Sequence, residues 1–186
     1  MEKELSQMSL IKLWELFPIY LTEHKECWAE WFLEENAILT KLLQDKVTIH
    51  HIGSTTIKSI WAKPIIDILL QANKNHFDFI KKTLINNGYI CMFESDNKIS
   101  FNKGYTNKGF AERVFHLHLK ESGDNKELYF CKYLKENPSV AKEYEKLKID
   151  LWKKYPNNRD GYTEAKSSFI GKYTEKAVKK YGNNNL

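Results

Sequence analysis

Apolar residues recur along the chain at two kinds of spacing, which divide it into helices and strands. Spacings of three and four residues predict amphipathic helices over 25–44, 76–87, 128–135, 138–154 and 162–181. A shorter helix over 9–16 starts after the N-cap Ser9 and ends before Pro18. Alternating or continuous apolar runs predict strands over 47–52, 65–70, 89–93, 98–102 and 114–120.

The order of these elements, helices then a mixed centre then helices, predicts an α+β domain with a helical C-terminal layer. We expect an N-terminal helical extension over 1–24 and one domain over 25–182, with its C-terminal helices over 125–182. The length of 186 residues suits a single domain, and 42% hydrophobic residues are enough to form its core.

Two strands carry polar residues where chemistry could occur. The run 65–70 is almost entirely apolar, which is typical of a central strand, yet Asp67 stands inside it and needs a partner if buried. In 114–120, His116 and His118 point to one side of the strand and the apolar residues to the other. Two histidines and an aspartate could form a metal site, or supply a general base. They could equally be hydrogen-bonded residues of a half-exposed sheet face.

A turn at Gly53-Ser54 follows the strand over 47–52, fourteen residues before Asp67. Glycine lets the backbone approach a ligand closely, serine adds a hydroxyl, and nearby N–H groups can face a phosphate. A carboxylate on the next strand could hold Mg²⁺ against that phosphate. The spacing alone leaves an equal alternative, in which Asp67 is satisfied by neighbouring backbone N–H groups.

Charge and cysteine content narrow the class of protein. Basic and acidic residues are equal in number over the first 119 residues, so the whole net charge of +5 comes from the residues beyond them. That positive charge could attract a phosphorylated ligand or form a solvated lysine-rich face. Basic and acidic residues alternate there, so we expect no nucleic-acid binding. Three scattered cysteines favour a reducing compartment. Without a signal-like or membrane-length apolar run, we expect a cytoplasmic protein that does not enter a membrane.

Several segments together resemble the GrpB family. They are His51-Ile52-Gly53-Ser54-Thr55, Ala62-Lys63-Pro64-Ile65-Ile66-Asp67-Ile68 and Phe115-His116-Leu117-His118-Leu119, with helical matches at Tyr144, Lys148, Tyr162, Lys166 and Phe169. The resemblance covers about residues 25–178. It implies a nucleotidyltransferase-like fold, a mixed β-sheet flanked by helices.

The resemblance also implies a site, and this sequence departs from it. Asp67 matches the first carboxylate of the superfamily, but the second, two residues later, is replaced by Leu69. Two-metal nucleotidyl transfer needs carboxylates that bridge both ions, so only a single-metal or metal-free variant would fit. The usual Val-Pro-Gly-Leu loop is replaced by residues 57–60, where Lys58 could meet phosphate or, as we favour, water.

The resulting site assignment covers three candidate catalytic and metal-binding residues, Asp67, His116 and His118. Candidate phosphate- or nucleotide-binding residues are Gly53, Ser54, Thr55, Lys63, Tyr162 and Lys166. Lys63 could instead pair with Asp67 or Glu112, and Tyr162 with Lys166 could serve surface and packing roles. Arg113 is a further possible phosphate contact. We expect Mg²⁺ or Mn²⁺ as the metal if one is used.

Three functions remain open from the sequence. The chain could transfer a nucleotidyl or phosphoryl group to a small molecule or protein, with a nucleotide or phosphorylated small molecule as ligand. It could bind a nucleotide or coenzyme A-like ligand without catalysis, as Leu69 suggests. It could also be a protein-interaction domain on a decayed enzyme fold. The oligomeric state is not indicated.

Overall fold

A computed structural model describes residues 5–182. The helices are α1 (Leu10–Leu16), α2 (Cys27–Leu43), α3 (Phe77–Asn86), α4 (Lys126–Glu136), α5 (Pro138–Lys154) and α6 (Arg159–Tyr181). The strands are β1 (Thr48–Ile52), β2 (Ile66–Ala72), β3 (Ile90–Ser95), β4 (Lys98–Thr106) and β5 (Gly109–Glu121). Every helix and strand predicted from the apolar spacing is present, and the Ser9 side chain caps α1.

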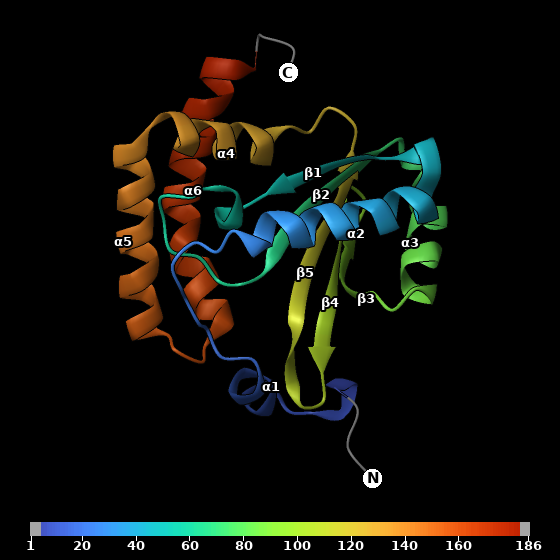
Figure 1. Cartoon of the computed structure of the whole chain (residues 1–186), viewed down its shortest axis with the longest axis horizontal. Helices are drawn as coiled ribbons and strands as arrows, with labels where there is room; N and C mark the ends of the chain where they lie inside the picture. The colour runs from blue at the N-terminus through green and yellow to red at the C-terminus, as the bar shows by residue number, and fades with distance from the viewer. Residues whose placement is uncertain (1–4, 183–186) are drawn as a thin grey trace.

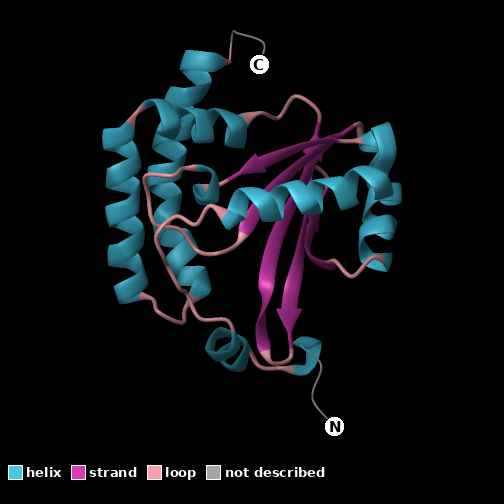
Figure 2. Ribbon diagram, viewed as in Figure 1, coloured by secondary structure: helices cyan, strands magenta, loops and turns pink. Residues whose placement is uncertain are grey.

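The strands form one mixed sheet in the order β1-β2-β5-β4-β3, drawn in magenta in Figure 2. Only β2 and β5 run parallel, and the other neighbouring pairs are antiparallel. The near-continuous apolar run therefore forms an inner strand between β1 and β5, as its composition predicts. The architecture is α+β, with α4, α5 and α6 together on one side of the molecule (Figure 1).

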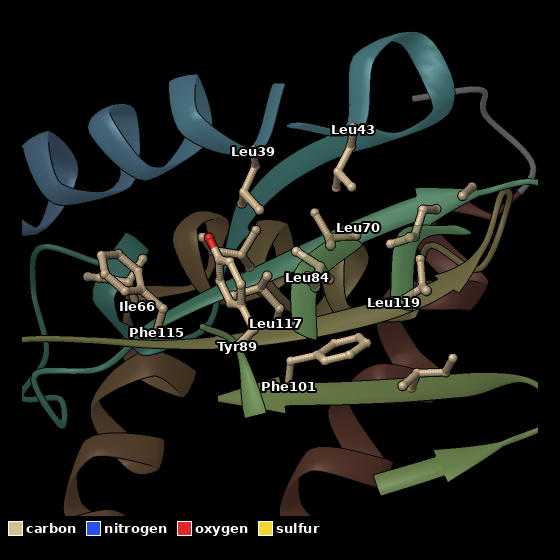
Figure 3. Close-up of a cluster of buried hydrophobic side chains, with 14 of the residues drawn as sticks. Leu39, Leu43, Ile66, Leu70, Leu84, Tyr89, Phe101, Phe115, Leu117 and Leu119 are labelled. Atoms are coloured by element: carbon tan, nitrogen blue, oxygen red, sulfur yellow. The ribbon is translucent and has the colours of Figure 1, made fainter. Parts of the chain in front are cut away.

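The core lies between one face of the sheet and helices α2 and α3. Figure 3 shows Leu39 and Leu43 of α2 facing Leu70 and Leu119 of the sheet, with Leu84 of α3 beside them. These five side chains are each 0% exposed, so burial of each contributes about 2 kcal/mol to stability. The apolar residues at three- and four-residue spacing in α2 and α3 therefore pack against the alternating apolar residues of β5 in this layer.

The opposite face of the sheet carries the polar residues of β2 and β5. Register pairs Asp67 with His116 and Leu69 with His118, so these four side chains share one face. Helix α4 covers part of that face, where Cys131 packs with Ile52 and Leu69. The sheet thus separates an apolar layer from a polar one that the C-terminal helices partly cover.

Strands β4 and β5 are longer than their sequence pattern predicts. They continue into a hairpin that closes at Thr106–Gly109 instead of ending at 102 and starting at 114. A bulge at Gly104 shifts the register between Lys103 and Tyr105. Gly104 has φ +88°, and a side chain there would collide with the Arg113 carbonyl. The bulge interrupts the two-residue alternation, which is why the pattern did not reveal these segments.

The segment after α1 packs into the domain. Phe17, Ile19 and Leu21 are each under 5% exposed, and the Ile19 N–H donates to the Pro156 carbonyl in the α5–α6 connection. The division at residues 24 and 25 remains a prediction, and the first four residues of that extension lie outside the described range. No helix within residues 5–182 has the length and apolar character to cross a bilayer.

Candidate functional site

A cavity of about 380 Å³ lies between the polar face of the sheet and the C-terminal helices. This volume falls in the range of roughly 300–1,000 Å³ that small-molecule sites occupy. The nine residues assigned to the site from the sequence, apart from the further suggestion of Arg113, all line it: Gly53, Ser54, Thr55, Lys63, Asp67, His116, His118, Tyr162 and Lys166. Residues up to 113 positions apart in the chain thus meet at one place, although their chemical roles remain predictions.

The turn after β1 is built against Asp67. Gly53 has φ +78°, and a Cβ atom placed there would lie 2.4 Å from Asp67 Oδ2. Only glycine combines this backbone conformation with so close an approach. The Gly53 N–H donates to Cys131 Sγ on α4 at 3.1 Å, so it is already engaged within the protein.

The neighbouring residues of the turn have different roles. The Thr55 hydroxyl is 2.9 Å from His51 Nε2, and the His51 ring stacks on Phe32, so this pair holds the turn on α2. Burial lowers the pKa of His51 to about 4, which keeps it neutral near pH 7. The Ser54 hydroxyl instead accepts a hydrogen bond from Lys148 of α5 at 3.1 Å. Ser54 is therefore the hydroxyl of the turn that stands beside a cation.

The two histidines face Asp67 in different settings. Asp67 Oδ1 lies 3.5 Å from His116 Nδ1 and 3.8 Å from His118 Nε2. Burial would raise the pKa of Asp67, but the two imidazoles outweigh it and hold that pKa below its usual range. Asp67 is therefore ionised at neutral pH, and the partner that its position in an apolar strand requires is the histidine pair.

His116 is fixed by a hydrogen-bonded chain. Arg159 donates to the Tyr105 hydroxyl at 2.8 Å, and that hydroxyl lies 2.8 Å from His116 Nε2. Because arginine can only donate, the arrangement that satisfies all three groups has Tyr105 donating to Nε2 and the His116 proton on Nδ1, towards Asp67. Both nitrogens of His116 are then engaged.

His118 is the less constrained of the two histidines. Its Nδ1 atom is buried and has no hydrogen-bond partner among the described residues. Of the two imidazoles, His118 is therefore better placed to change its contacts when a ligand enters. Between residues 5 and 182, no group of three or more His, Cys, Asp and Glu side chains is arranged to hold a metal ion. The metal-binding role of Asp67, His116 and His118 remains a prediction.

Three lysines surround the cavity: Lys148 is buried, and Lys63 and Lys166 are partly buried. Burial, reinforced by the neighbouring charge of Lys166, lowers the pKa of both Lys63 and Lys148 to about 7. Burial similarly lowers the pKa of Lys166 to about 8. The Lys63 and Lys166 ammonium groups lie 5.3 and 4.4 Å from the centre of the Tyr162 ring, which they flank. Lys63 forms no ion pair with a described carboxylate, so neither Asp67 nor Glu112 neutralises it.

Comparison with known proteins bears on this site. The sequence model of the GrpB protein family matches residues 18–176. The chain belongs to the GrpB family. It is 38% identical to the glutamate-rich protein GrpB of Alkalihalophilus pseudofirmus over 160 residues, which are 82% of this chain and 91% of that protein. It is 34% identical to the UPF0157 protein YqkA of Bacillus subtilis over 97% of this chain and 54% of that relative, about half its length.

Solved structures agree with the family and define the fold. The crystal structure of the conserved protein GrpB from Enterococcus faecalis matches with a TM-score of 0.76 and 31% identity, over 88% of this chain and 100% of that one. A structure of Cid1, a protein with RNA terminal uridylyl transferase activity, matches with a TM-score of 0.51 and 10% identity, over 78% of this chain and 44% of that one. This GrpB protein therefore has a nucleotidyltransferase-like fold.

The position of the missing carboxylate is filled by a core residue in this GrpB protein. Leu69 is 0% exposed and packs with Ile52 and Cys131 beneath α4. An ionised side chain there would be buried in an apolar cluster at high cost. The residues present thus do not fit the two-metal arrangement of the wider superfamily.

The sequence analysis did not assign three basic residues that line the cavity of this GrpB protein. Lys98, Lys148 and Arg159 all line the cavity, from β4, α5 and the start of α6. Lys148 carried a recognisable signal, because it continues the buried helical stripe of Ala141 and Tyr144, where lysine is out of place. Lys98 and Arg159 stand at the ends of their elements, where no periodicity marks them.

Two other basic residues lie away from the cavity. Arg113 forms an ion pair with Glu34 and lies over the Trp31 ring of α2, so the structure does not bring it together with the other candidate phosphate contacts. Lys58 is 74% exposed and pairs with Glu26, in agreement with the expectation that it faces water. The loop around it is anchored by Ile57 and Ile60, which pack against the C-terminal helices.

Proposed function

We propose that this GrpB protein binds a nucleotide or another phosphorylated small molecule in the cavity over Asp67. The observation that carries the proposal is the balance of charge among the lining residues. Five cationic side chains converge there, Lys63, Lys98, Lys148, Arg159 and Lys166, against two carboxylates, Asp67 and Glu127. Of these carboxylates, Glu127 already forms an ion pair with Lys120, outside the lining.

A polyphosphate is the ligand that suits this balance. Burial is the main cause of the lowered pKa values of Lys63 and Lys148, and the positive charge of Lys166 lowers both further. An anion with several charges would relieve the repulsion between these cations and accept charge-assisted hydrogen bonds. Ser54 stands next to Lys148 and adds a neutral donor at the same place. We therefore expect affinity to rise from AMP to ADP to ATP.

Isothermal titration calorimetry with ATP, ADP, AMP and coenzyme A tests the proposal directly. We expect ATP or coenzyme A to bind with a dissociation constant in the micromolar range, and adenosine not to bind. Adenosine serves as the control because it lacks phosphate but keeps the base and sugar. If none of the phosphorylated compounds binds, the proposed function is wrong.

Affinity for ATP should fall as pH rises from 7.5 to 9. Lys63 and Lys148 have pKa values of about 7 in the free protein, and a bound polyphosphate raises them, so binding takes up protons. Above pH 7 each such proton costs up to tenfold in affinity per pH unit, so we expect about a tenfold loss or more between pH 7.5 and 8.5.

The other charged groups facing these lysines do not oppose the trend. Lys166, whose pKa is lowered to about 8 by burial, loses its charge over the same range and adds to the loss of affinity. Asp67, whose pKa is held below its usual range, stays ionised. ATP itself is almost fully ionised above pH 7.5. Calorimetry in two buffers of different ionisation enthalpy would measure proton uptake independently. Affinity that is constant across this range would show that Lys63 and Lys148 do not contact the phosphates.

We expect a divalent cation to bind together with the phosphorylated ligand. Mg²⁺ in nucleotide sites is commonly held by one or two carboxylates together with phosphate oxygens and water. Asp67 is the cavity carboxylate without a lysine or arginine partner among the described residues, so it is the residue that would hold Mg²⁺ or Mn²⁺. Comparison of ATP titrations with and without Mg²⁺, for the unaltered chain and Asp67→Asn, would show whether the ion depends on this residue.

Transfer of a nucleotidyl or phosphoryl group is the second candidate function. The observation favouring it is that Asp67 and His118 lie in contact on the sheet, directly beside the turn at Gly53. We expect label from α- or γ-labelled ATP to reach a small molecule or protein in a cell extract, and Asp67→Ala to abolish it. Equal labelling by Asp67→Ala, or none by either, would leave the protein as a binding module.

A further inference from the structure

A second cavity, of about 390 Å³, lies beneath α1 beside the long hairpin of β4 and β5. Its walls are mainly apolar, with Leu13 and Trp14 of α1 on one side and Ile90 and Met92 of β3 on the other. Met92 is 57% exposed and Ile90 is 40% exposed, although both are large apolar side chains. Figure 1 shows α1 near the closed end of the hairpin.

One charged residue is common to the two cavities. Arg159 lines both of them, and Tyr105, to which it donates, also lines the second. The chain from Arg159 through Tyr105 to His116 therefore forms the wall between the two spaces. A ligand in the second cavity would touch the same residues that hold His116.

Arg159 has donors to spare. A guanidinium carries five N–H groups, and the hydrogen bonds of Arg159 within the described chain go to the Phe17 carbonyl and the Tyr105 hydroxyl. It forms no ion pair with a carboxylate among residues 5–182, although it is only partly exposed. Asp160 also lines the cavity, but its side chain is exposed to solvent. A partly buried arginine without a counter-ion is suited to a carboxylate, which it can bind through two parallel hydrogen bonds.

We propose that the second cavity binds a small amphipathic molecule with an apolar body and one carboxylate. The apolar body would lie on Leu13, Trp14, Ile90 and Met92, and the carboxylate would accept hydrogen bonds from Arg159 at the inner end. This inference goes beyond the proposed function, because it stands on the second cavity and does not require that the first one binds a nucleotide.

Methionine NMR tests occupancy of the cavity at a single site. The chain has three methionines, so ¹³C-methyl labelling yields a simple spectrum in which Met92 can be assigned with Met92→Leu. The probes are octanoate and 1-octanol, which share an apolar chain and differ in charge. We expect octanoate to shift the Met92 signal in a saturable way and octanol to bind about tenfold more weakly.

Matched variants separate a specific site from a merely apolar surface. Arg159→Gln should weaken octanoate binding about tenfold and leave octanol unchanged, whereas Arg113→Gln, on the other side of the sheet, should alter neither. Leu13→Trp should fill the cavity and abolish both shifts while ATP binding, measured by calorimetry, persists.

Two results would overturn the inference. Either Met92 does not respond to octanoate, or octanoate and octanol bind equally and Arg159→Gln changes neither. Because ATP binding is measured separately, failure of this inference and failure of the proposed function can be distinguished.

Discussion

Replacement of Lys148 by methionine is expected to weaken ATP binding about 30- to 100-fold without destabilising the protein. Lys148 is 3% exposed, and its ammonium group donates to the Ser54 hydroxyl and the Trp61 carbonyl. Loss of a buried charged donor to a phosphate costs about 2–3 kcal/mol of binding free energy. Methionine keeps the unbranched apolar stem of lysine, so the packing of α5 is retained.

The free energy of unfolding of Lys148→Met should not fall together with its affinity for ATP. Burial lowers the pKa of Lys148 to about 7, so at pH 8 the unfolded chain binds more protons at this residue than the folded chain. This difference disfavours folding, and methionine removes it. Urea titrations at pH 8 should therefore give a free energy of unfolding that is unchanged or higher.

Lys146 provides a matched control for Lys148. It lies on the same helix but is 80% exposed and pairs with Asp150 at the surface. Lys146→Met should alter ATP affinity by less than about twofold, because an exposed ion pair contributes little. If Lys148→Met binds ATP as well as Lys146→Met does, the cationic cavity is not the binding site.

Gly53→Ala is expected to destabilise the protein by about 2–4 kcal/mol and to abolish ATP binding. Alanine at φ +78° is strained, and its Cβ atom would overlap Asp67 Oδ2 at 2.4 Å, against which the turn is built. Relief of that overlap must move either the turn or the carboxylate. Either Ser54 or Asp67 would then leave the position that the proposed site requires.

Gly88→Ala separates the effect of backbone strain from the effect of the overlap with Asp67. Gly88 has φ +83°, close to that of Gly53, but an added Cβ atom there would meet nothing within 4 Å. It should lose about 1 kcal/mol of unfolding free energy through backbone strain alone and bind ATP normally. Denaturant titrations and calorimetry of both variants provide the comparison. Equal losses of stability would show that the close approach of Gly53 to Asp67 does not affect the free energy of unfolding.

Local sequence features predicted most of the fold because they report on nearest neighbours. The periodicity of α2 and the alternation of β5 both reflect which residues face the apolar layer shown in Figure 3. The extension of the hairpin was missed because the bulge at Gly104 changes the phase of the alternation. A single inserted residue is enough to hide several residues of strand from a pattern with a period of two.

Part of the site was accessible in the same way. An aspartate within an apolar strand and two histidines on one side of another strand are local anomalies, and each marks a polar residue in a layer that should be apolar. The turn at Gly53-Ser54 was marked by its glycine. These features were enough to select Gly53, Ser54, Asp67, His116 and His118 among the residues that line the cavity over the sheet.

By itself, the amino-acid sequence determined the order of the elements, the polar face of β2 and β5, and the substitution of Leu69 for a carboxylate. Only the tertiary structure decided that Lys148 and Arg159 join that face, that Arg113 does not, and that a second cavity shares Arg159. The physical reason is that hydrophobic periodicity specifies which side of an element is buried. The packing of helices far apart in the chain specifies which charges meet across the space between them.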